Sequence, residues 1–201
     1  MGVICNGPRK SGTNALRALI IELGIKEASG GIMDYYYYTP KRESVEGLDF
    51  IESNLGNRVI GSHSPFLKSK HKIITLLRDP RNIALSYFRA MQKAHKKRAT
   101  KKAFKLFLEK DVFFNVSVKF FLEQENNSLL VWFEDLFEKT TVKKIAKFID
   151  VPYKDVSKAF GKSPTWSGKL SNHQEWFNDN LEQDFFIKWY KFLGEAKNGN
   201  R

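Results

Sequence analysis

The feature that most constrains this chain is a short apolar strand that runs through a turn with two glycines into a helix. Val3-Ile4-Cys5 has the composition of a buried strand, and the Asn6-Gly7-Pro8 breaker ends it. Apolar residues then recur at helical spacing from Thr13 to Leu23, and Gly24 closes that run. A strand, a glycine-bearing turn and a helix in this order predict the first βα unit of an α/β fold.

The rest of the chain continues this alternation of short apolar runs with longer helical ones. Because the strand-like runs are apolar throughout, they favour a parallel sheet covered on both faces. We therefore expect an α/β fold, one domain over residues 1–201, with a central parallel sheet and helices on both faces. The further strands are expected at Arg58–Gly61, Lys72–Leu77 and Leu129–Phe133, and the further helices at Pro80–Gln92, 101–109, 112–124, Val142–Ile149 and Asn180–Leu193.

Composition excludes several classes of protein. The chain is 42% hydrophobic, which is too apolar for a disordered protein. Its one cysteine, Cys5, makes neither an internal disulfide nor a cysteine zinc cluster. No apolar run has the length of a signal peptide core or a membrane span, so we expect a soluble, cytoplasmic protein without membrane attachment. The net charge of +12 favours an anionic ligand.

The turn after the first strand has the composition of an anion-binding loop. Gly7 and Gly12 have the spacing of a phosphate-binding P-loop, but Thr13-Asn14 replace its Lys-Ser/Thr pair, and Lys10 precedes the second glycine. Backbone N–H groups at the helix start and the Lys10 ammonium would attract an anion without an obvious metal partner. The alternative is a capped turn that carries a solvated lysine.

Four segments in order resemble the PAPS-dependent sulfotransferase family (PAPS is 3′-phosphoadenosine 5′-phosphosulfate). Pro8–Thr13 resembles the loop that binds the 5′-phosphosulfate, and Arg78–Tyr87 resembles the second signature, whose arginine and serine hold the 3′-phosphate. Leu130–Leu136 is similar to the strand that leads into Tyr-Glu-Asp, and Ser167–His173 is similar to the late glycine–lysine loop. The resemblance covers residues 3 to about 194.

This resemblance implies a P-loop NTPase-like fold and sulfuryl transfer from PAPS, with no metal. Two departures from the family pattern are the extra Arg9 and a phenylalanine, Phe133, where a tyrosine is common. The residues expected to bind PAPS are Arg9, Lys10, Ser11, Gly12, Thr13, Asn14, Arg78, Ser86, Phe133, Ser167, Gly168 and Lys169.

Two residues are candidates for the chemistry itself. Lys10 is suited to the leaving oxygen, because its ammonium is a compact donor in the loop that would hold the phosphate. His63, which follows the Arg58–Gly61 strand, is the expected base, and a branch of the family carries its catalytic histidine in a similar segment. The reserve candidates for the base are Asp34 and Glu43.

The acceptor is expected to be a small molecule or a glycan, and the sequence leaves its identity and the oligomeric state open. The tyrosines at 35–38 would either line the acceptor cleft or pack on the surface. Lys93–Lys102 carries six lysine and arginine residues, which suit a solvated helix end, an acidic glycan or a nucleic acid. His71, His95 and His173 have no strand-end setting and no assigned role.

Two other functions remain as alternatives. A small P-loop-like kinase would need Mg²⁺ and a lysine after Gly12, and the chain has Thr13 there. A basic nucleic-acid-binding domain would account for the charge of +12, but it would not use a Lys10 loop together with an Arg78–Ser86 pair, so nucleic acid is an unlikely partner.

Overall fold

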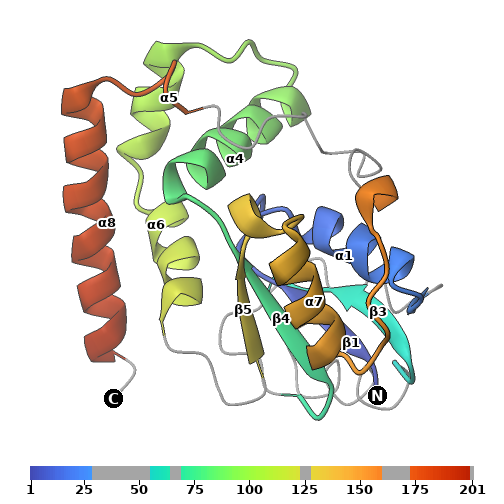
Figure 1. The fold of residues 1–201 in the computed structure, drawn as a ribbon. Coiled ribbons are helices and arrows are strands. Elements are labelled where there is room, and N and C mark those ends of the chain that lie inside the picture. The colour runs from blue at the N-terminus through green and yellow to red at the C-terminus, as the bar shows by residue number, and fades with distance from the viewer. Residues whose placement is uncertain (29–54, 64–68, 123–127, 160–172, 200–201) are drawn as a thin grey trace. The chain divides into compact units, whose positions relative to one another are not determined.

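The structure is a computed structural model that describes residues 1–28, 55–63, 69–122, 128–159 and 173–199 (Figure 1). The chain divides into two compact units, Met1–Leu77 with Gln124–Gly168, and Arg78–Glu123 with Lys169–Arg201. The elements of the first unit are β1 (Val3–Asn6), α1 (Thr13–Glu22), β2 (Lys26–Glu27), β3 (Arg58–Gly61), β4 (Lys72–Leu77), β5 (Ser128–Trp132), η2 (Phe133–Asp135), α7 (Lys139–Phe148) and η3 (Ser157–Ala159). Those of the second are α4 (Pro80–Ala94), α5 (Lys101–Leu108), α6 (Val112–Ser117), η1 (Val118–Phe121) and α8 (Asp179–Gly199).

The first unit is built on a parallel sheet with the strand order β2-β3-β1-β4-β5. Strand β1 is central and pairs in parallel with both neighbours, with Cys5 opposite Gly61 on β3 and opposite Ile74 on β4. All its pairings are parallel, so the strands end at one common edge. The predicted α/β class, with a parallel sheet flanked by helices, is confirmed.

The sequence signals that predicted the first helix operate as expected. Helix α1 begins directly after Gly12 and ends at Glu22, and Gly24 adopts a left-handed conformation with φ of 108°. The Gly24 N–H donates to the Ile21 carbonyl at 2.9 Å, and the Ile25 N–H donates to the Ile20 carbonyl at 3.3 Å. These bonds satisfy carbonyls of the last turn, which is why glycine is favoured just past a helix end.

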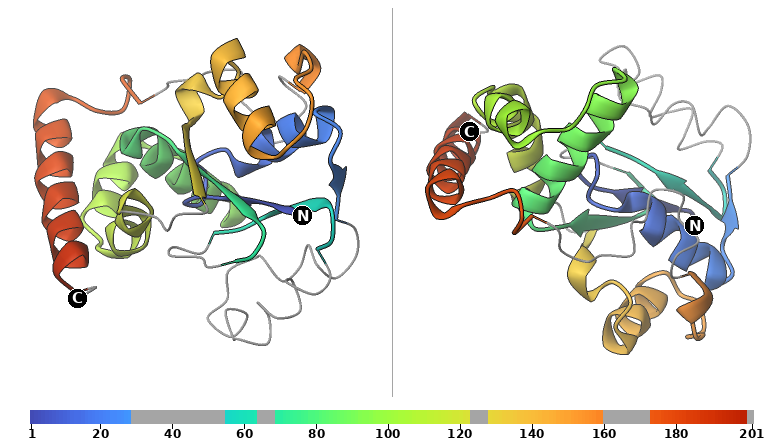
Figure 2. Two further views of the ribbon diagram at one scale, coloured as in Figure 1. Left: turned by 60° about the horizontal axis from the view of Figure 1, so that its bottom comes forward. Right: turned by 90° about the horizontal axis from the view of Figure 1, so that it is seen from above.

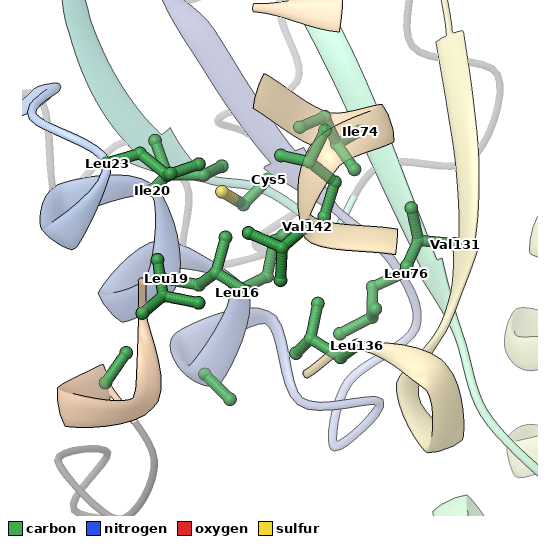
Figure 3. Close-up of a cluster of buried hydrophobic side chains, with 14 of the residues drawn as sticks. Cys5, Leu16, Leu19, Ile20, Leu23, Ile74, Leu76, Val131, Leu136 and Val142 are labelled. Carbon is green, nitrogen blue, oxygen red and sulfur yellow. The ribbon is translucent and has the colours of Figure 1, made fainter. Parts of the chain in front are cut away.

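Helices α1 and α7 cover the same face of the sheet (Figures 2 and 3). Figure 3 shows Leu16, Leu19 and Ile20 of α1 directed toward strand residues such as Cys5 and Ile74. The three α1 side chains are fully buried, as the helical spacing of the apolar residues predicts. Burial raises the pKa of the Cys5 thiol, so this cysteine is an inert core residue.

The second unit is helical and has an aromatic core. Phe88 of α4 packs against Phe104 of α5 with ring centroids 5.2 Å apart, and Phe114 of α6 packs against Phe185 of α8 at 5.3 Å. These four rings are at most 2% exposed. Large rigid side chains bury much apolar area at low entropic cost, which suits a small helical unit.

Several elements differ from the sequence-based expectation. The helix predicted at 112–124 is a short α6 followed by the 3₁₀ helix η1. Helix α8 runs past the predicted end to Gly199. Strand β2 was not predicted, because its two charged, exposed residues carry no apolar pattern and only pairing with β3 defines it.

Candidate functional site

The candidate site of the first unit lies at the edge where the parallel strands end. The loop Gly7–Gly12 follows β1, Ser62 and His63 follow β3, and Phe133 follows β5. The Ser62 N–H donates to the Cys5 carbonyl at 2.8 Å, which ties the segment after β3 to the end of β1. Ligands of open α/β sheets bind at this edge, so the sheet brings the expected site residues of the first unit to the expected place.

The loop between β1 and α1 has an unusual backbone. Gly7, Lys10 and Gly12 all have positive φ angles, of 151°, 75° and 107°. The Ser11 N–H donates to the Pro8 carbonyl at 3.0 Å and closes a tight turn around Arg9 and Lys10. A lysine is strained in the left-handed region, and such strain is concentrated at functional sites.

The start of α1 offers an anion-binding site. Among the described residues no side chain caps this helix start. The Ala15 and Leu16 N–H groups donate to the Gly12 carbonyl, which leaves the earlier N–H groups outside the helical ladder. The Ser11 hydroxyl is fully buried and has no hydrogen-bond partner in the part of the chain that the structure describes. Uncapped N–H groups, a helix dipole and an orphaned hydroxyl together suit a phosphate or sulfate group.

Both loop glycines are held against other backbone and core atoms. A Cβ at Gly7 would lie 2.5 Å from the Leu76 carbonyl oxygen and 2.7 Å from the Ser11 hydroxyl oxygen. A Cβ at Gly12 would lie 2.4 Å from two ring carbons of Phe133. Only glycine fits at either position, so the loop has one well-defined path around the space at the helix start.

His63 is anchored to this loop. Its Nδ1 lies 2.8 Å from the Gly7 carbonyl oxygen, which can only accept, so Nδ1 carries the proton and Nε2 of the neutral ring keeps its lone pair. Burial lowers the pKa of His63, the bond to Gly7 offsets part of that effect, and the charges of Arg9 and Lys10 lower the pKa further. The imidazole is therefore neutral at neutral pH and able to accept a proton at Nε2.

Phe133 has a packing role in the structure. Its side chain is 2% exposed, belongs to the core cluster beneath α1 and α7, and lies against Gly12. The sequence expectation gave this ring a contact with adenine, which stays a prediction.

Arg78 and Ser86 belong to the second unit. Arg78 directly follows Leu77, the last residue of β4, and is buried, with 7% of its surface exposed. Ser86 lies in the second turn of α4 and is half-buried. The predicted strand-end arginine and helical serine thus have the expected local settings.

The start of α4 holds an ion-pair network that the sequence analysis missed. Asp79 caps the helix, because its carboxylate accepts from the Arg81 backbone N–H at 2.9 Å and from the Arg81 guanidinium, which also pairs with Glu182 of α8. Burial alone would raise the pKa of Asp79, but its bonds to Arg81 outweigh burial and the pKa lies below its usual range. The Asp-Pro pair after a strand was the available signal for this cap.

The remaining histidines have structural settings. His173 Nδ1 lies 3.1 Å from the Asn82 side-chain oxygen in the second unit, and burial lowers the pKa of this histidine. His71 Nδ1 accepts from the Gly2 backbone N–H at 3.1 Å in the first unit. His95 follows the last residue of α4 and is exposed.

Several predicted site residues lie outside the described part of the chain. These are Ser167, Gly168 and Lys169 of the late loop, the reserve bases Asp34 and Glu43, and the tyrosines at 35–38. In the described ranges, no cluster of three or more His, Cys, Asp or Glu side chains is arranged to hold a metal ion. No helix in those ranges combines the length and hydropathy needed to span a bilayer.

Comparison with known proteins identifies the family. The model of the sulfotransferase domain matches residues 2–188. The fold is similar to that of mouse sulfotransferase SULT7A1, crystallised with PAP (3′-phosphoadenosine 5′-phosphate), with a TM-score of 0.70 and 16% identity over 96% of this chain and 84% of that one. It is also similar to retinol dehydratase with PAP (TM-score 0.58, 14% identity, 96% and 80% covered) and to a sulfotransferase from Alicyclobacillus acidocaldarius (TM-score 0.56, 13% identity, 98% and 94% covered).

A search of curated proteins found no match. The structural likenesses, all of low identity, show the fold, whereas the domain match spans nearly the whole chain. The expected resemblance and enzyme class are therefore confirmed at the level of the family: this chain belongs to the sulfotransferase domain family.

Proposed function

We propose that this protein transfers a sulfuryl group from PAPS to a hydroxyl or amine of a small-molecule or glycan acceptor. The observation that carries the proposal is the glycine loop before α1. It combines a helix start without a side-chain cap, a buried Ser11 hydroxyl without a hydrogen-bond partner among the described residues, and a lysine, Lys10, with a positive φ. Membership of the sulfotransferase family favours this function over a kinase or a nucleic-acid-binding domain. Two proteins of similar fold were crystallised with PAP, the desulfated product.

The loop residues fit the phosphosulfate end of PAPS. The residues that would hold it are Arg9, Lys10, Ser11, Gly12, Thr13 and Asn14. When bound, PAPS supplies the sulfuryl group. Backbone N–H groups at Gly12–Asn14 would bind the 5′-phosphate oxygens, and the Ser11 hydroxyl would gain the partner that it lacks among the described residues.

Lys10 is assigned to the oxygen that becomes negatively charged during transfer. The tight turn from Pro8 to Ser11 holds the Lys10 backbone at a φ of 75° beside the helix start. An ammonium carried by this turn would stabilise negative charge on a phosphate oxygen, which is where charge develops when a sulfuryl group leaves. Stabilisation of developing charge by preorganised donors is a major part of the catalysis of such transfers.

His63 is assigned as the base for a hydroxyl acceptor. The Gly7 carbonyl fixes the proton on Nδ1, so Nε2 is the atom that would take the acceptor proton. The same loop thus carries the donor Lys10 and orients the proposed base. Asp34 and Glu43 remain the alternatives for this role.

The residues assigned to the 3′-phosphate rest on the resemblance. Arg78 and Ser86 would bind this phosphate, with Ser167, Gly168 and Lys169 closing over it, and Phe133 would contact the adenine. Arginine suits this role because its planar fork binds phosphate with two hydrogen bonds and keeps its charge at any working pH. The cytoplasmic location stays a prediction.

The decisive experiment is a calorimetric titration of the protein with PAP in the presence of EDTA, together with thermal unfolding at increasing PAP concentrations. We expect saturable binding without Mg²⁺, and thermal stabilisation that grows with PAP concentration. Stabilisation only by ATP with Mg²⁺ would contradict the proposal and favour a kinase. Binding to random oligonucleotides that PAP does not affect would favour a nucleic-acid-binding domain.

Variants then separate the roles. A screen of phenol, alcohol, amine and sugar acceptors with labelled PAPS first identifies a substrate. With that substrate, His63→Ala should keep its PAP affinity and lose about 10²–10⁴-fold in transfer rate. The control variant His95→Ala should keep both the PAP affinity and the transfer rate. Lys10→Ala should bind PAP slightly more weakly and lose transfer, with Lys26→Ala as its control. Arg78→Ala should weaken PAP far more than adenosine 5′-phosphosulfate, and equal weakening of both would remove the 3′-phosphate assignment.

A further inference from the structure

The second unit carries a concentration of positive charge that the proposed transfer reaction does not use. Between Asp79 and Glu109 the sequence has nine lysine and arginine residues and no carboxylate. The seven of them in 93–105 are all exposed. They are Lys93, Lys96, Lys97, Arg98, Lys101, Lys102 and Lys105.

Two of these lysines lie where the helix dipole disfavours them. Lys101 and Lys102 are the first two residues of α5, at the positive end of the helix dipole, and the first turn of α5 has no acidic residue, whereas Lys105 lies in the last turn. Lys101 and Lys105 are four residues apart, so these like charges face each other along the helix. Both effects oppose folding, which indicates that this charge arrangement serves something other than the stability of α5.

The same lysines line a groove. Its volume is about 740 Å³, within the range of ligand sites, and all of its lining residues belong to the second unit. Figure 1 shows the segment that leads into α8 beside α5. The lining comprises Lys101, Lys102, Lys105, Gln174, Glu175, Trp176, Phe177, Asn178, Asn180, Leu181 and Asp184.

The aromatic part of the groove is rigidly held. Trp176 is half-buried, and its ring meets Phe104 edge-on with centroids 5.7 Å apart. The Arg89 guanidinium lies over the same ring, 5.0 Å from its centroid. A fixed indole beside exposed polar side chains is a surface on which a sugar ring can pack.

The polar side chains of the groove favour an acidic oligosaccharide over a nucleic acid as the ligand. Glu175, Asp184 and Asn180 lie in the groove beside the lysines, and all three are exposed. Carboxylates and amides accept hydrogen bonds from sugar hydroxyls, and carboxylates repel sulfate and phosphate groups alike, so they suit a ligand that can place neutral hydroxyls beside them rather than one with a phosphate at every residue. The combination of ammonium groups with hydroxyl acceptors therefore fits an acidic oligosaccharide better than a nucleic acid.

We propose that the groove between α5 and the start of α8 binds an acidic oligosaccharide, with Lys101, Lys102 and Lys105 on its sulfate or carboxylate groups and Glu175 and Asp184 on its hydroxyls. This site is separate from the residues proposed to bind PAPS and does not depend on their role. It gives the Lys93–Lys102 run a function as the flank of a glycan-binding surface.

The test is the binding of a heparin-derived hexasaccharide to the full chain, measured by calorimetry at two salt concentrations. The variant is Lys101→Gln/Lys102→Gln/Lys105→Gln. Its control is Lys143→Gln/Lys144→Gln/Lys147→Gln on α7, which removes the same charge at the same spacing from another exposed helix face. We expect the α5 variant to lose at least about tenfold in affinity and the α7 control less than about twofold.

Thermal unfolding of the same proteins monitors the fold. Because the α5 substitutions remove like-charge and dipole repulsion, the Tm of that variant should equal or exceed that of the parent. Equal loss of hexasaccharide affinity in both triple variants would overturn the proposal, since it would mean unspecific attraction to a basic protein. The absence of binding by the parent protein would overturn it as well.

A second variant, Glu175→Ala/Asp184→Ala, removes the hydroxyl acceptors, separates a glycan from a nucleic acid and leaves the lysines intact. We expect it to bind the hexasaccharide at least about threefold more weakly, since hydroxyl acceptors are lost, and a single-stranded oligonucleotide more tightly, since repulsion is lost. Tighter binding of both ligands would overturn the assignment of the carboxylates to sugar hydroxyls. An oligonucleotide that the parent binds more tightly than the hexasaccharide would overturn the choice of a glycan.

Discussion

Replacing Gly12 by alanine tests whether the loop before α1 has the path described. Gly12 has φ of 107°, and a Cβ there would lie 2.4 Å from two ring carbons of Phe133, which is 2% exposed and packed in the core. The left-handed backbone costs an alanine about 1–2 kcal/mol. Forcing a methyl group against a buried ring that cannot move freely costs about 1–3 kcal/mol more. We expect Gly12→Ala to lower the free energy of unfolding by about 2–5 kcal/mol.

Gly56→Ala is the matched control. Gly56 also has a positive φ, of 54°, but a Cβ there would meet no atom within 4 Å. This variant should therefore show the backbone cost of about 1–2 kcal/mol alone. A double variant, Gly12→Ala with Phe133→Leu, removes the ring from the clash, and the coupling between the two substitutions should be about 1–3 kcal/mol in the favourable direction.

The assay is urea unfolding followed by circular dichroism, with the PAP affinity of each folded variant measured by calorimetry. We expect Gly12→Ala to lose PAP affinity beyond what Gly56→Ala loses, because the helix start must move away from the ring. Two results together would refute the contact between the loop and the Phe133 ring. Gly12→Ala would unfold at the same urea concentration as Gly56→Ala, and the effects of Gly12→Ala and Phe133→Leu on the free energy of unfolding would simply add in the double variant. The proposed anion site would then lose its geometric basis.

Three further predictions concern Lys10, His63 and Asp79. Because Lys10 has φ of 75°, Lys10→Gly should be more stable than Lys10→Ala by about 1 kcal/mol in urea unfolding, although both lose sulfuryl transfer; equal stability would argue against the strained turn. Because the pKa of His63 is lowered from 6.5 and the neutral ring is the base, transfer should be lost only below pH 6.5, and an acid limb of kcat/KM above that pH would contradict the assignment. Asp79→Ala should cost about 1–2 kcal/mol at pH 7. Since the folded pKa of Asp79 lies below 3.8, that difference is present above the unfolded pKa and should vanish as the pH falls through the folded one; a difference that is constant down to pH 2 would refute the ion pair.

Much of the site could be predicted because its signals are local. The Gly7–Gly12 loop, the helix start at Thr13 and the strand-end arginine at Arg78 follow from spacing, turn residues and apolar runs. These signals involve residues within about two turns of one another, where backbone preferences decide the conformation. The family motifs supplied the ligand chemistry that the local pattern alone left open.

Other features needed the structure because they join distant parts of the chain. The Asp79–Arg81–Glu182 network spans α4 and α8, and the Arg81–Glu182 pair is separated by 101 residues. In sequence the Lys93–Lys102 run suits a solvated helix end, an acidic glycan or a nucleic acid, whereas in the structure Lys101 and Lys102 line a groove with residues 174–184. Such contacts depend on how helices pack, and no local pattern encodes them.

By itself, then, the sequence determined an α/β chain with a parallel sheet, a glycine loop between the first strand and helix, and a histidine after the Arg58–Gly61 strand. Tertiary structure alone decided which nitrogen of His63 holds its proton, because the Gly7 carbonyl that binds it lies 56 residues away in the chain. It also decided that Phe133 is buried against Gly12. The physical reason is the same in both cases: periodicity and capping act along the backbone, whereas burial and hydrogen-bond partners of side chains are set by the packing of strands that meet at one edge of the sheet.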